Sequence, residues 1–332
     1  MWLLRKMAWP ISILYGVAVL TRNLLYDQHI LKSKKYNIPI LCVGNLSVGG
    51  TGKTPMIEFL ISRLKDQKKL AVLSRGYKRH SKGFQLGTSQ STATQMGDEP
   101  FQILRKFPDI AVAVDANRQN GILNLQKRID PELILLDDAY QHRKVTPTFS
   151  ILLTTYSDPF YKDWYLPTGN LRDAKSASKR ADCIVVTKCP KNLENSEMEV
   201  LRKNLRKSSH QIVVFSTLVY KEFLQGTNAR KKLSDLENES FTLVTGIANP
   251  QPLVDYLNEK NLRFDHLKFP DHHEFQQHEL KKLREKRNIL TTEKDYVRLY
   301  DKIEGLHYIT VEHKFLENGE SELLEAIAQK ID

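Results

Sequence analysis

The chain has 332 residues, of which 41% are hydrophobic and 27% are charged, so a disordered protein is excluded and two ordinary domains fit the length. Lys and Arg total 50 against 39 Asp and Glu, a net charge of +11. This excess suits nucleic acid, an anionic membrane or a phosphorylated substrate. Cys42, Cys183 and Cys189 form no C-x-x-C pair, which excludes a disulfide scaffold.

The N-terminal segment, residues 1–36, holds a large part of the positive charge. Basic residues flank the apolar run 7–20, which is shorter than the ~20 residues that cross a bilayer. A signal peptide, a core helix and a membrane-docked helix all compete for this pattern. No clear cleavage site follows, which counts against a signal peptide. We favour the docked helix, because basic residues on both sides of a short apolar run are unusual for a core helix. Trp2, Trp9 and Tyr15 would then lie near the headgroups, with basic residues on anionic lipid.

From residue 37 the pattern becomes α/β. Short apolar runs alternate with helical stretches, which predicts a mostly parallel sheet covered by helices, in a domain spanning 37–218. A helix is expected over about 53–65, and long loops over 77–97 and 155–180. The expected strands are 38–43, 70–74, 110–114, 133–136, 150–154 and 183–187.

A charged stretch at 219–240 is predicted to be a linker. After it the α/β pattern restarts, which predicts a smaller C-terminal α/β domain over 241–332. Its expected elements are strands at 241–245, 288–290 and 307–311 and helices at 252–260 and 320–330.

The strongest motif is a glycine-rich turn between the first expected strand and helix, the context that a P-loop requires. Backbone N–H groups would surround phosphate oxygens, Lys53 would reach the β- and γ-phosphates, and the Thr54 hydroxyl would ligate Mg²⁺. Ser47 stands where the strict pattern has glycine. The predicted nucleotide-binding residues are Ser47, Val48, Gly49, Gly50, Thr51, Gly52, Lys53 and Thr54.

Three acidic residues follow or precede regular elements. Asp137 and Asp138 end an apolar run, which fits a metal site, although one of them would serve equally as a cap. Asp98 opens an expected helix, where it would either cap the helix or take a proton from an acceptor hydroxyl.

The densest titratable cluster is Asp271-His272-His273. His273 and His278 are one residue too far apart for a zinc-binding H-E-x-x-H motif, so a metalloprotease is rejected. Two adjacent His beside an Asp indicate proton handling or phosphate contact.

Taken together, the motifs resemble the tetraacyldisaccharide 4′-kinase family of the lipid A pathway in Gram-negative bacteria. The resemblance runs from about residue 1 to Thr292-Glu-Lys-Asp295. Its other motifs are Gly44-Asn-Leu-Ser-Val-Gly-Gly-Thr-Gly-Lys-Thr-Pro55, Ser74-Arg-Gly-Tyr77, Gly97-Asp-Glu-Pro100, Asp137-Asp-Ala-Tyr-Gln-His142, Leu166-Pro-Thr-Gly-Asn-Leu-Arg172, Gly246-Ile-Ala-Asn-Pro250 and Asp271-His-His273.

The resemblance implies a P-loop NTPase-like kinase with ATP and Mg²⁺. It would phosphorylate the 4′-hydroxyl of a tetraacyldisaccharide 1-phosphate to give lipid IVA. The resemblance also implies one membrane-associated N-terminal helix on the cytoplasmic face of the inner membrane, and an active site between two α/β domains. Asp98 would form a dyad with His272, or with His273 as the alternative, while Asp137 and Asp138 serve the metal.

Two other functions stay open on the residues alone. A P-loop kinase or ATPase acting on another acceptor would carry the same phosphate loop. A membrane-attached nucleotide switch would carry it too, but it has no need of the Asp271–His273 cluster. Nucleic acid is not an expected partner, because no motif for it appears.

Overall fold

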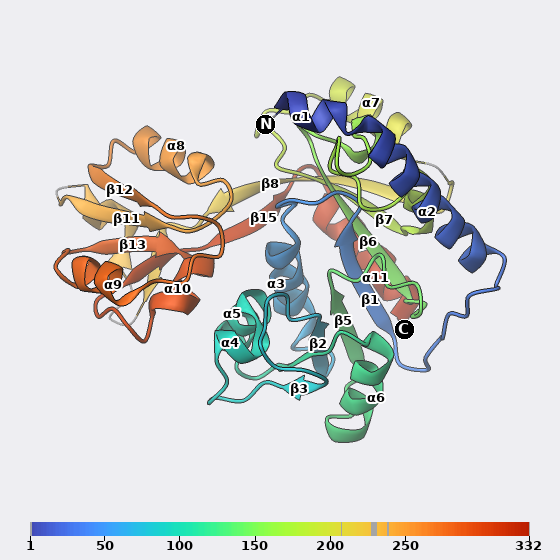
Figure 1. Cartoon of the computed structure of the whole chain (residues 1–332), viewed down its shortest axis with the longest axis horizontal. Helices are drawn as coiled ribbons and strands as arrows, with labels where there is room; N and C mark the ends of the chain where they lie inside the picture. Colours follow the sequence, from blue (N-terminus) through green and yellow to red (C-terminus); the bar gives the residue numbers. More distant parts are fainter. Residues whose placement is uncertain (1, 207, 227–230, 238, 332) are drawn as a thin grey trace.

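The computed structural model describes residues 2–206, 208–226, 231–237 and 239–331. Within these residues the strands form two sheets, one of nine strands and one of six. Figure 1 shows each sheet in its own α/β unit, with β8 (Ile212–Tyr220) and β15 (Val311–Phe315) running between the units. We call these the larger and the smaller unit.

The larger sheet has the strand order β15-β8-β7-β6-β1-β5-β2-β4-β3. Neighbours are parallel except β3 with β4 and β15 with β8. In the register of β1 and β5, Val43 lies opposite Asp137, so the turn after β1 and the end of β5 meet at one edge. The remaining strands are β1 (Ile40–Asn45), β2 (Leu70–Ser74), β3 (Gln85–Leu86), β4 (Ala111–Val114), β5 (Leu133–Asp137), β6 (Phe149–Thr155) and β7 (Cys183–Thr187).

Helices cover both faces of this sheet, as the buried apolar strands require. One face packs on α3 (Lys53–Leu64), α4 (Ala93–Met96), α5 (Asp98–Lys106) and α11 (Gly319–Ile331). The other packs on α6 (Arg118–Arg128), α7 (Asn195–Leu205) and the short 3₁₀ segments Phe160–Lys162 and Lys175–Arg180.

The smaller sheet has the order β10-β9-β14-β13-β11-β12, and its last four strands are parallel. Separate apolar clusters lie on its two faces. Its strands are β9 (Phe223–Gly226), β10 (Lys231–Lys232), β11 (Phe241–Thr245), β12 (Phe264–Lys268), β13 (Ile289–Thr292) and β14 (His307–Ile309). Its helices are the 3₁₀ turn Leu233–Leu236, α8 (Gln251–Glu259), α9 (Gln277–Arg284) and α10 (Glu293–Leu299).

The structure differs from the expected division in two places. The stretch expected as a linker, 219–240, contributes β9 and β10 to the smaller sheet, while 227–230 and 238 lie outside the described residues. The expected strand 307–311 is two strands in different sheets. The second of these, β15, pairs along the edge of β8, and α11 buries Leu323 and Ile327 on the larger sheet. Residues 311–331 therefore lie on the larger unit, although the expected second domain ran to 332.

The N-terminal helices are α1 (Trp2–Met7) and α2 (Trp9–Asp27). Polar side chains fix α2 to the chain around residues 163–173. Ser12 Oγ donates to Thr168 Oγ1 at 2.8 Å, and Asn23 Nδ2 donates to Asp173 Oδ1 at 2.7 Å. The buried residues of α2 are Ser12, Gly16, Asn23 and Tyr26, so the face that meets the protein carries small and polar residues and one tyrosine.

Candidate active site

The glycine-rich turn joins β1 to α3, as the motif predicts. Gly49 and Gly52 have φ values of 116° and 88°, a region that favours glycine. No atom would lie within 4 Å of a Cβ on Gly49 or Gly50. The turn is therefore open on its outer side, next to the first turn of α3, where backbone N–H groups and the helix dipole favour an anion.

The inner side of this turn is held by buried partners. Asn45 Nδ2 donates to Thr51 Oγ1 at 3.0 Å, and Thr187 Oγ1 donates to the Thr51 carbonyl at 2.9 Å. His313 Nε2 lies 2.9 Å from the Gly52 carbonyl, and burial lowers the pKa of His313 to about 4, so the neutral ring donates there. His313 was absent from the predicted site, because it lies on β15, 261 positions after Gly52 in the sequence.

Lys53 and Asp138 meet beside the turn. Lys53 Nζ lies 3.8 Å from Asp138 Oδ1, and Arg172 donates to both oxygens of Asp138. Burial disfavours the charge on Asp138, but Lys53 and Arg172 outweigh burial and lower the pKa of this carboxyl. Asp138 is thus an ionised group between two cations. The sequence predicted Arg172 only as the last residue of the Leu166–Arg172 motif, and not as a partner of Asp138.

Asp137 has the opposite electrostatics. It is 3% exposed, and its Oδ2 accepts from Ser74 Oγ at 2.9 Å. Burial, with the charges of Glu99 and Asp138, raises the pKa of Asp137 to about 7. A carboxylate held beside like charges is stabilised by a cation. The described residues contain no group of three or more His, Cys, Asp or Glu arranged for a metal.

These residues nonetheless fit Mg²⁺. This ion takes oxygen ligands and is usually held by one or two carboxylates together with substrate phosphates, not by a full protein cage. Asp137 and the Thr54 hydroxyl at the start of α3 supply the right donor chemistry at the edge that carries the phosphate loop. Asp138 fits less well, because Arg172 already occupies both of its oxygens.

A second cluster joins the two units. His272 Nδ1 lies 2.8 Å from Asp98 Oδ2, although these residues are 174 positions apart. Asp98 begins α5 of the larger unit, and His272 follows β12 of the smaller unit with a φ of 61°. His273 instead lies 2.8 Å from Glu279 and stacks on Phe269. The structure therefore brings His272, and not His273, to Asp98.

Two cations of α10 complete this cluster, and the predicted site contained neither. Arg298 Nε donates to Asp98 Oδ2 at 3.1 Å, and Lys294 Nζ lies 3.1 Å from His272 Nε2. Burial opposes the charge on Asp98, but hydrogen bonds from His272 and Arg298 hold the pKa of Asp98 well below its usual range. A weak signal existed in the sequence, because the Thr292-Glu-Lys-Asp295 motif contains Lys294 and ends three positions before Arg298.

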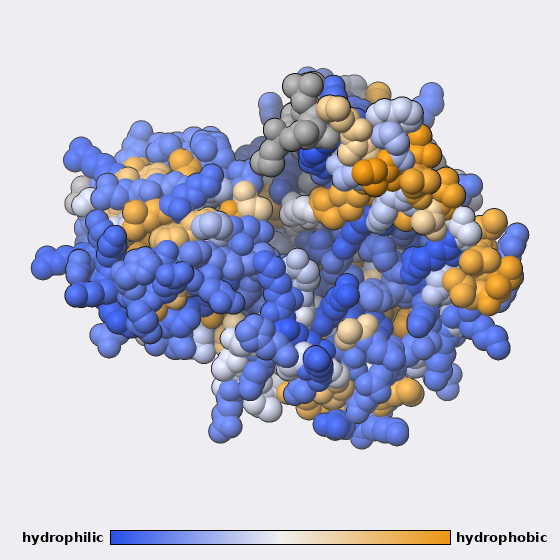
Figure 2. Space-filling model, viewed as in Figure 1, coloured by the Kyte–Doolittle hydropathy of each residue, from blue (hydrophilic) through white to orange (hydrophobic). Residues whose placement is uncertain are grey.

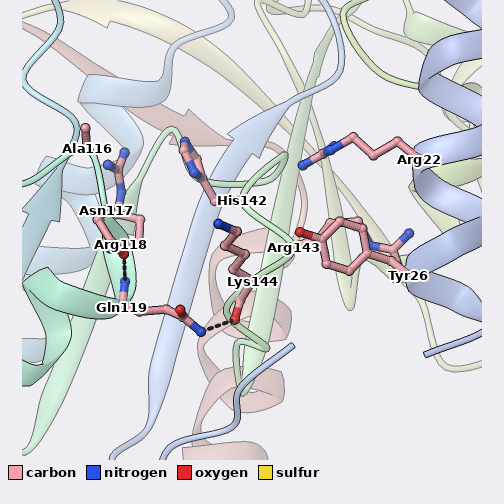
Figure 3. Close-up of a pocket in the computed structure, with 9 residues that line it drawn as sticks. All are labelled: Arg22, Tyr26, Ala116, Asn117, Arg118, Gln119, His142, Arg143 and Lys144. Atoms are coloured by element: carbon pink, nitrogen blue, oxygen red, sulfur yellow. Dashed lines mark hydrogen bonds between the residues drawn. The ribbon is translucent and has the colours of Figure 1, made fainter. Parts of the chain in front are cut away.

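A hollow of about 390 Å³ lies between α2 and the N-terminus of α6 (Figure 3). Arg22 and Tyr26 reach it from α2, and Asn117–Gln119 and His142–Lys144 form the other walls. Its basic residues are Arg22, Arg118, Arg143 and Lys144. Burial, Arg118 and Arg75 lower the pKa of His142 to about 4, so this ring is neutral. The hollow suits an anionic group and adjoins the sheet edge through Arg118, whose Nη2 donates to the Asp137 carbonyl at 3.4 Å.

The outer surface of α2 is apolar. Leu14 and Val17 are 71% and 56% exposed, and Figure 2 shows hydrophobic side chains gathered over this helix. A helix on a water-soluble surface has the reverse arrangement, with its apolar stripe inward. Among the described residues, no helix is long and apolar enough to cross a membrane. The exposed apolar set of α2 consists of Trp9, Ile11, Ile13, Leu14, Val17, Leu20 and Leu24, and Met7 at the end of α1 is exposed beside it in the sequence.

Known proteins resemble the chain over its full length. The family described as LpxK, Tetraacyldisaccharide-1-P 4′-kinase, matches residues 4–332. Tetraacyldisaccharide 4′-kinase of Flavobacterium johnsoniae is 46% identical over 339 residues, covering 99% of each chain. The enzyme of that name from Bacteroides thetaiotaomicron is 42% identical, covering 89% of this chain and 83% of the relative.

A solved structure shares the fold. The crystal structure of the "apo" form of LpxK from Aquifex aeolicus in complex with ATP superposes with a TM-score of 0.80. It is 28% identical and covers 99% of this chain and 100% of the other.

Proposed function

The chain belongs to the tetraacyldisaccharide 4′-kinase family, and we propose that it uses ATP to phosphorylate the 4′-hydroxyl of a tetraacyldisaccharide 1-phosphate, giving lipid IVA. It is an ATP-dependent lipid kinase, as its relatives over the whole chain are. The observation that carries the residue assignments is the Asp98–His272 pair, in which His272 Nδ1 of the smaller unit lies 2.8 Å from Asp98 Oδ2 of the larger unit.

The larger unit would hold the nucleotide. Backbone N–H groups of residues 47–54 would surround the β- and γ-phosphates, with Lys53 neutralising charge on them. Thr54 and Asp137, with Asp138 nearby, would hold Mg²⁺, which supplies further neutralisation of the phosphates when bound. Asp138, which Arg172 holds in place, keeps Lys53 beside the turn.

The smaller unit would supply the base. Asp98 accepts the Nδ1–H of His272, so the lone pair of His272 is on Nε2. The 4′-hydroxyl would replace Lys294 Nζ, which lies 3.1 Å from this nitrogen, and would give its proton there. The hydroxyl oxygen bonds to the γ-phosphorus as the bond to the β,γ-bridging oxygen breaks. ADP leaves with that electron pair, and the proton passes from His272 to solvent. Contact between the units would exclude water, which competes with the sugar as acceptor.

The substrate would reach this site from a membrane surface. We place the exposed apolar set of α2 in the lipid interface, on the cytoplasmic face of the inner membrane, with nearby basic residues on anionic headgroups. The basic hollow opens beside the same helix, so its four cations suit a phosphate of the lipid. We propose that the chain divides into three parts. They are an N-terminal helical segment (1–36), a kinase domain formed by 37–218 together with 311–331, and a smaller α/β domain whose sequence lies between these two parts of the kinase domain.

The decisive experiment measures ATP turnover by the full chain in detergent with and without a tetraacyldisaccharide 1-phosphate. We expect turnover that depends on the lipid, with one phosphate added at the 4′ position by mass spectrometry and NMR. Equal hydrolysis with and without lipid would favour a simple ATPase. Binding of nucleotide with no transfer to any acceptor would favour a membrane-attached switch.

A further inference from the structure

Helix α10 of the smaller unit lies against α5 of the larger unit (Figure 1). Its polar residues meet those of α5 in three ion pairs. The pairs are Glu293 with Lys106, Lys294 with Glu99 and Arg298 with Asp98. The contact therefore runs along α5 and ends on a residue that the proposed reaction uses.

Arg298 is fixed within its own unit before it reaches Asp98. Its Nη1 donates to Asp295 Oδ1 at 3.2 Å, and the residue is 9% exposed. Asp295 is fully buried, and its Oδ2 accepts from the Gly246 N–H at 2.8 Å and from Thr292 Oγ1 at 2.7 Å. The planar guanidinium is thus presented to the other unit in a fixed orientation.

One oxygen of Asp98 receives all the donors. Arg298 Nε and Nη2 and His272 Nδ1 all lie within 3.1 Å of Oδ2. Arg298 Nη2 is also 3.1 Å from His272 Nδ1, so guanidinium and imidazole lie side by side on the same carboxylate. An oxygen shared in this way acts as an acceptor, which fixes the Nδ1–H form of His272 and turns its Nε2 outward. There Nε2 accepts from Lys294 Nζ.

We propose that Arg298 is a positioning residue for phosphoryl transfer, supplied by the smaller unit, that holds Asp98 as the carboxylate orienting His272. This inference rests on the proposed function. Arg298 contacts neither substrate in this scheme and acts through Asp98. The larger unit supplies Asp98, and the smaller unit supplies His272 and Arg298. His272 is therefore oriented for proton transfer only when the two units are in contact.

The alternative is that Arg298 has only a structural role and stabilises the contact between the two units. The same helix pair offers a matched control for it, because Lys106 bridges Glu58 and Glu293 with N–O distances of 2.6 Å and 2.9 Å. Glu293→Gln weakens this second tie between the units without touching Asp98, and Lys106 keeps Glu58 as a partner. A structural role predicts similar effects for the two sites.

The test compares Arg298→Met and Arg298→Lys with Glu293→Gln in the lipid-phosphorylation assay. We expect Arg298→Met to lower kcat about 10- to 100-fold, with KM for lipid and ATP changed less than about threefold. Arg298→Lys should recover part of kcat, since lysine keeps the positive charge but lacks the planar set of N–H donors of the guanidinium. Glu293→Gln should stay within about threefold of wild type.

A spectroscopic readout separates positioning from stability. Histidine ¹⁵N spectra of the labelled full chain, with His272→Gln to identify the signal, should show the Nδ1–H form of His272 in wild type. We expect Arg298→Met to lose this single form. If Arg298→Met does not fold, Arg298→Lys carries both measurements.

Three outcomes would overturn the inference: wild-type kcat in both Arg298 variants, an equal loss in Glu293→Gln, or a loss confined to KM. The proposed function fails separately. In that case the wild-type chain itself adds no phosphate to the lipid, whatever the variants do.

Discussion

The phosphate loop and the Asp98–His272 pair are assembled in different ways. The loop and the acids beside it belong to one sheet, where neighbouring parallel strands bring their ends to one edge. The pair joins residues 174 positions apart, across the contact of α5 with α10. Nucleotide binding therefore depends on local chain and sheet order, whereas acceptor activation depends on two separately folded units meeting.

The largest expected effect tests the first region. Lys53→Ala should lower kcat about 10³-fold, because the transferring phosphates lose their nearest positive charge in the loop. Steady-state transfer to the lipid measures this. The control is Lys65→Ala, an exposed residue just after the same helix, which should stay within about twofold. Wild-type turnover in Lys53→Ala would contradict a role of the glycine-rich turn in phosphate transfer.

The next effect tests the second region. Asp98→Asn should lower kcat about 10²-fold, since an amide of the same shape no longer fixes His272 as a proton acceptor. Nucleotide affinity, measured by calorimetry, should change little, because Asp98 lies outside the loop. Asp109→Asn, an exposed residue shortly after the same helix, is the control. A large loss of ATP affinity in Asp98→Asn would contradict the assignment of nucleotide binding and acceptor activation to separate regions.

A smaller effect concerns the surface that delivers the lipid. Leu14→Gln combined with Val17→Gln should weaken partition onto anionic vesicles about tenfold, because both side chains leave the interface. Sedimentation with vesicles measures it, and raised salt should weaken binding further. Leu123→Gln removes an equally apolar residue, 40% exposed, from α6 and should change nothing. If the α2 variant and the Leu123→Gln variant bound vesicles equally well, the proposed contact of α2 with the membrane would be wrong.

The smallest effect is on stability. Asp137 has its pKa raised to about 7 from 3.8, so its stabilising contribution is complete below about pH 4 and is lost as pH rises through about 7. Asp137→Asn should therefore gain about 1–2 kcal/mol over wild type near pH 8 without nucleotide, and less near pH 5. Urea unfolding at both pH values measures this, with exposed Asp301→Asn as the control. A pH-independent difference would contradict the assigned burial cost.

The contrast between the regions also explains what the sequence could predict. The strands 70–74 and 183–187 and the helix from Lys53 follow from apolar runs, glycines and helix periodicity, all of which are local. Asp137 and Asp138 follow from their place at the end of such a run. Strand β8 was missed, and so was the return of β15 and α11 to the larger sheet, because strand pairing over long separations leaves no local pattern.

The missed site residues have the same cause. His313 and Arg298 act on residues 261 and 200 positions away, and each is surrounded in sequence by ordinary helix or strand residues. The choice of His272 over His273 came from family resemblance, and the two neighbours separate only once His273 packs on Phe269 and Glu279. Side-chain placement after a strand end depends on packing that residue types alone do not specify.

The central claim is that residues from two units form one base, and a double-mutant cycle tests it most directly. Asp98→Asn, His272→Gln and the double variant are compared by kcat for phosphate transfer to the lipid at saturating ATP. Two groups that act as one unit predict a double variant no slower than the slower single variant. Losses that multiply would show that Asp98 and His272 act independently, and would contradict the account.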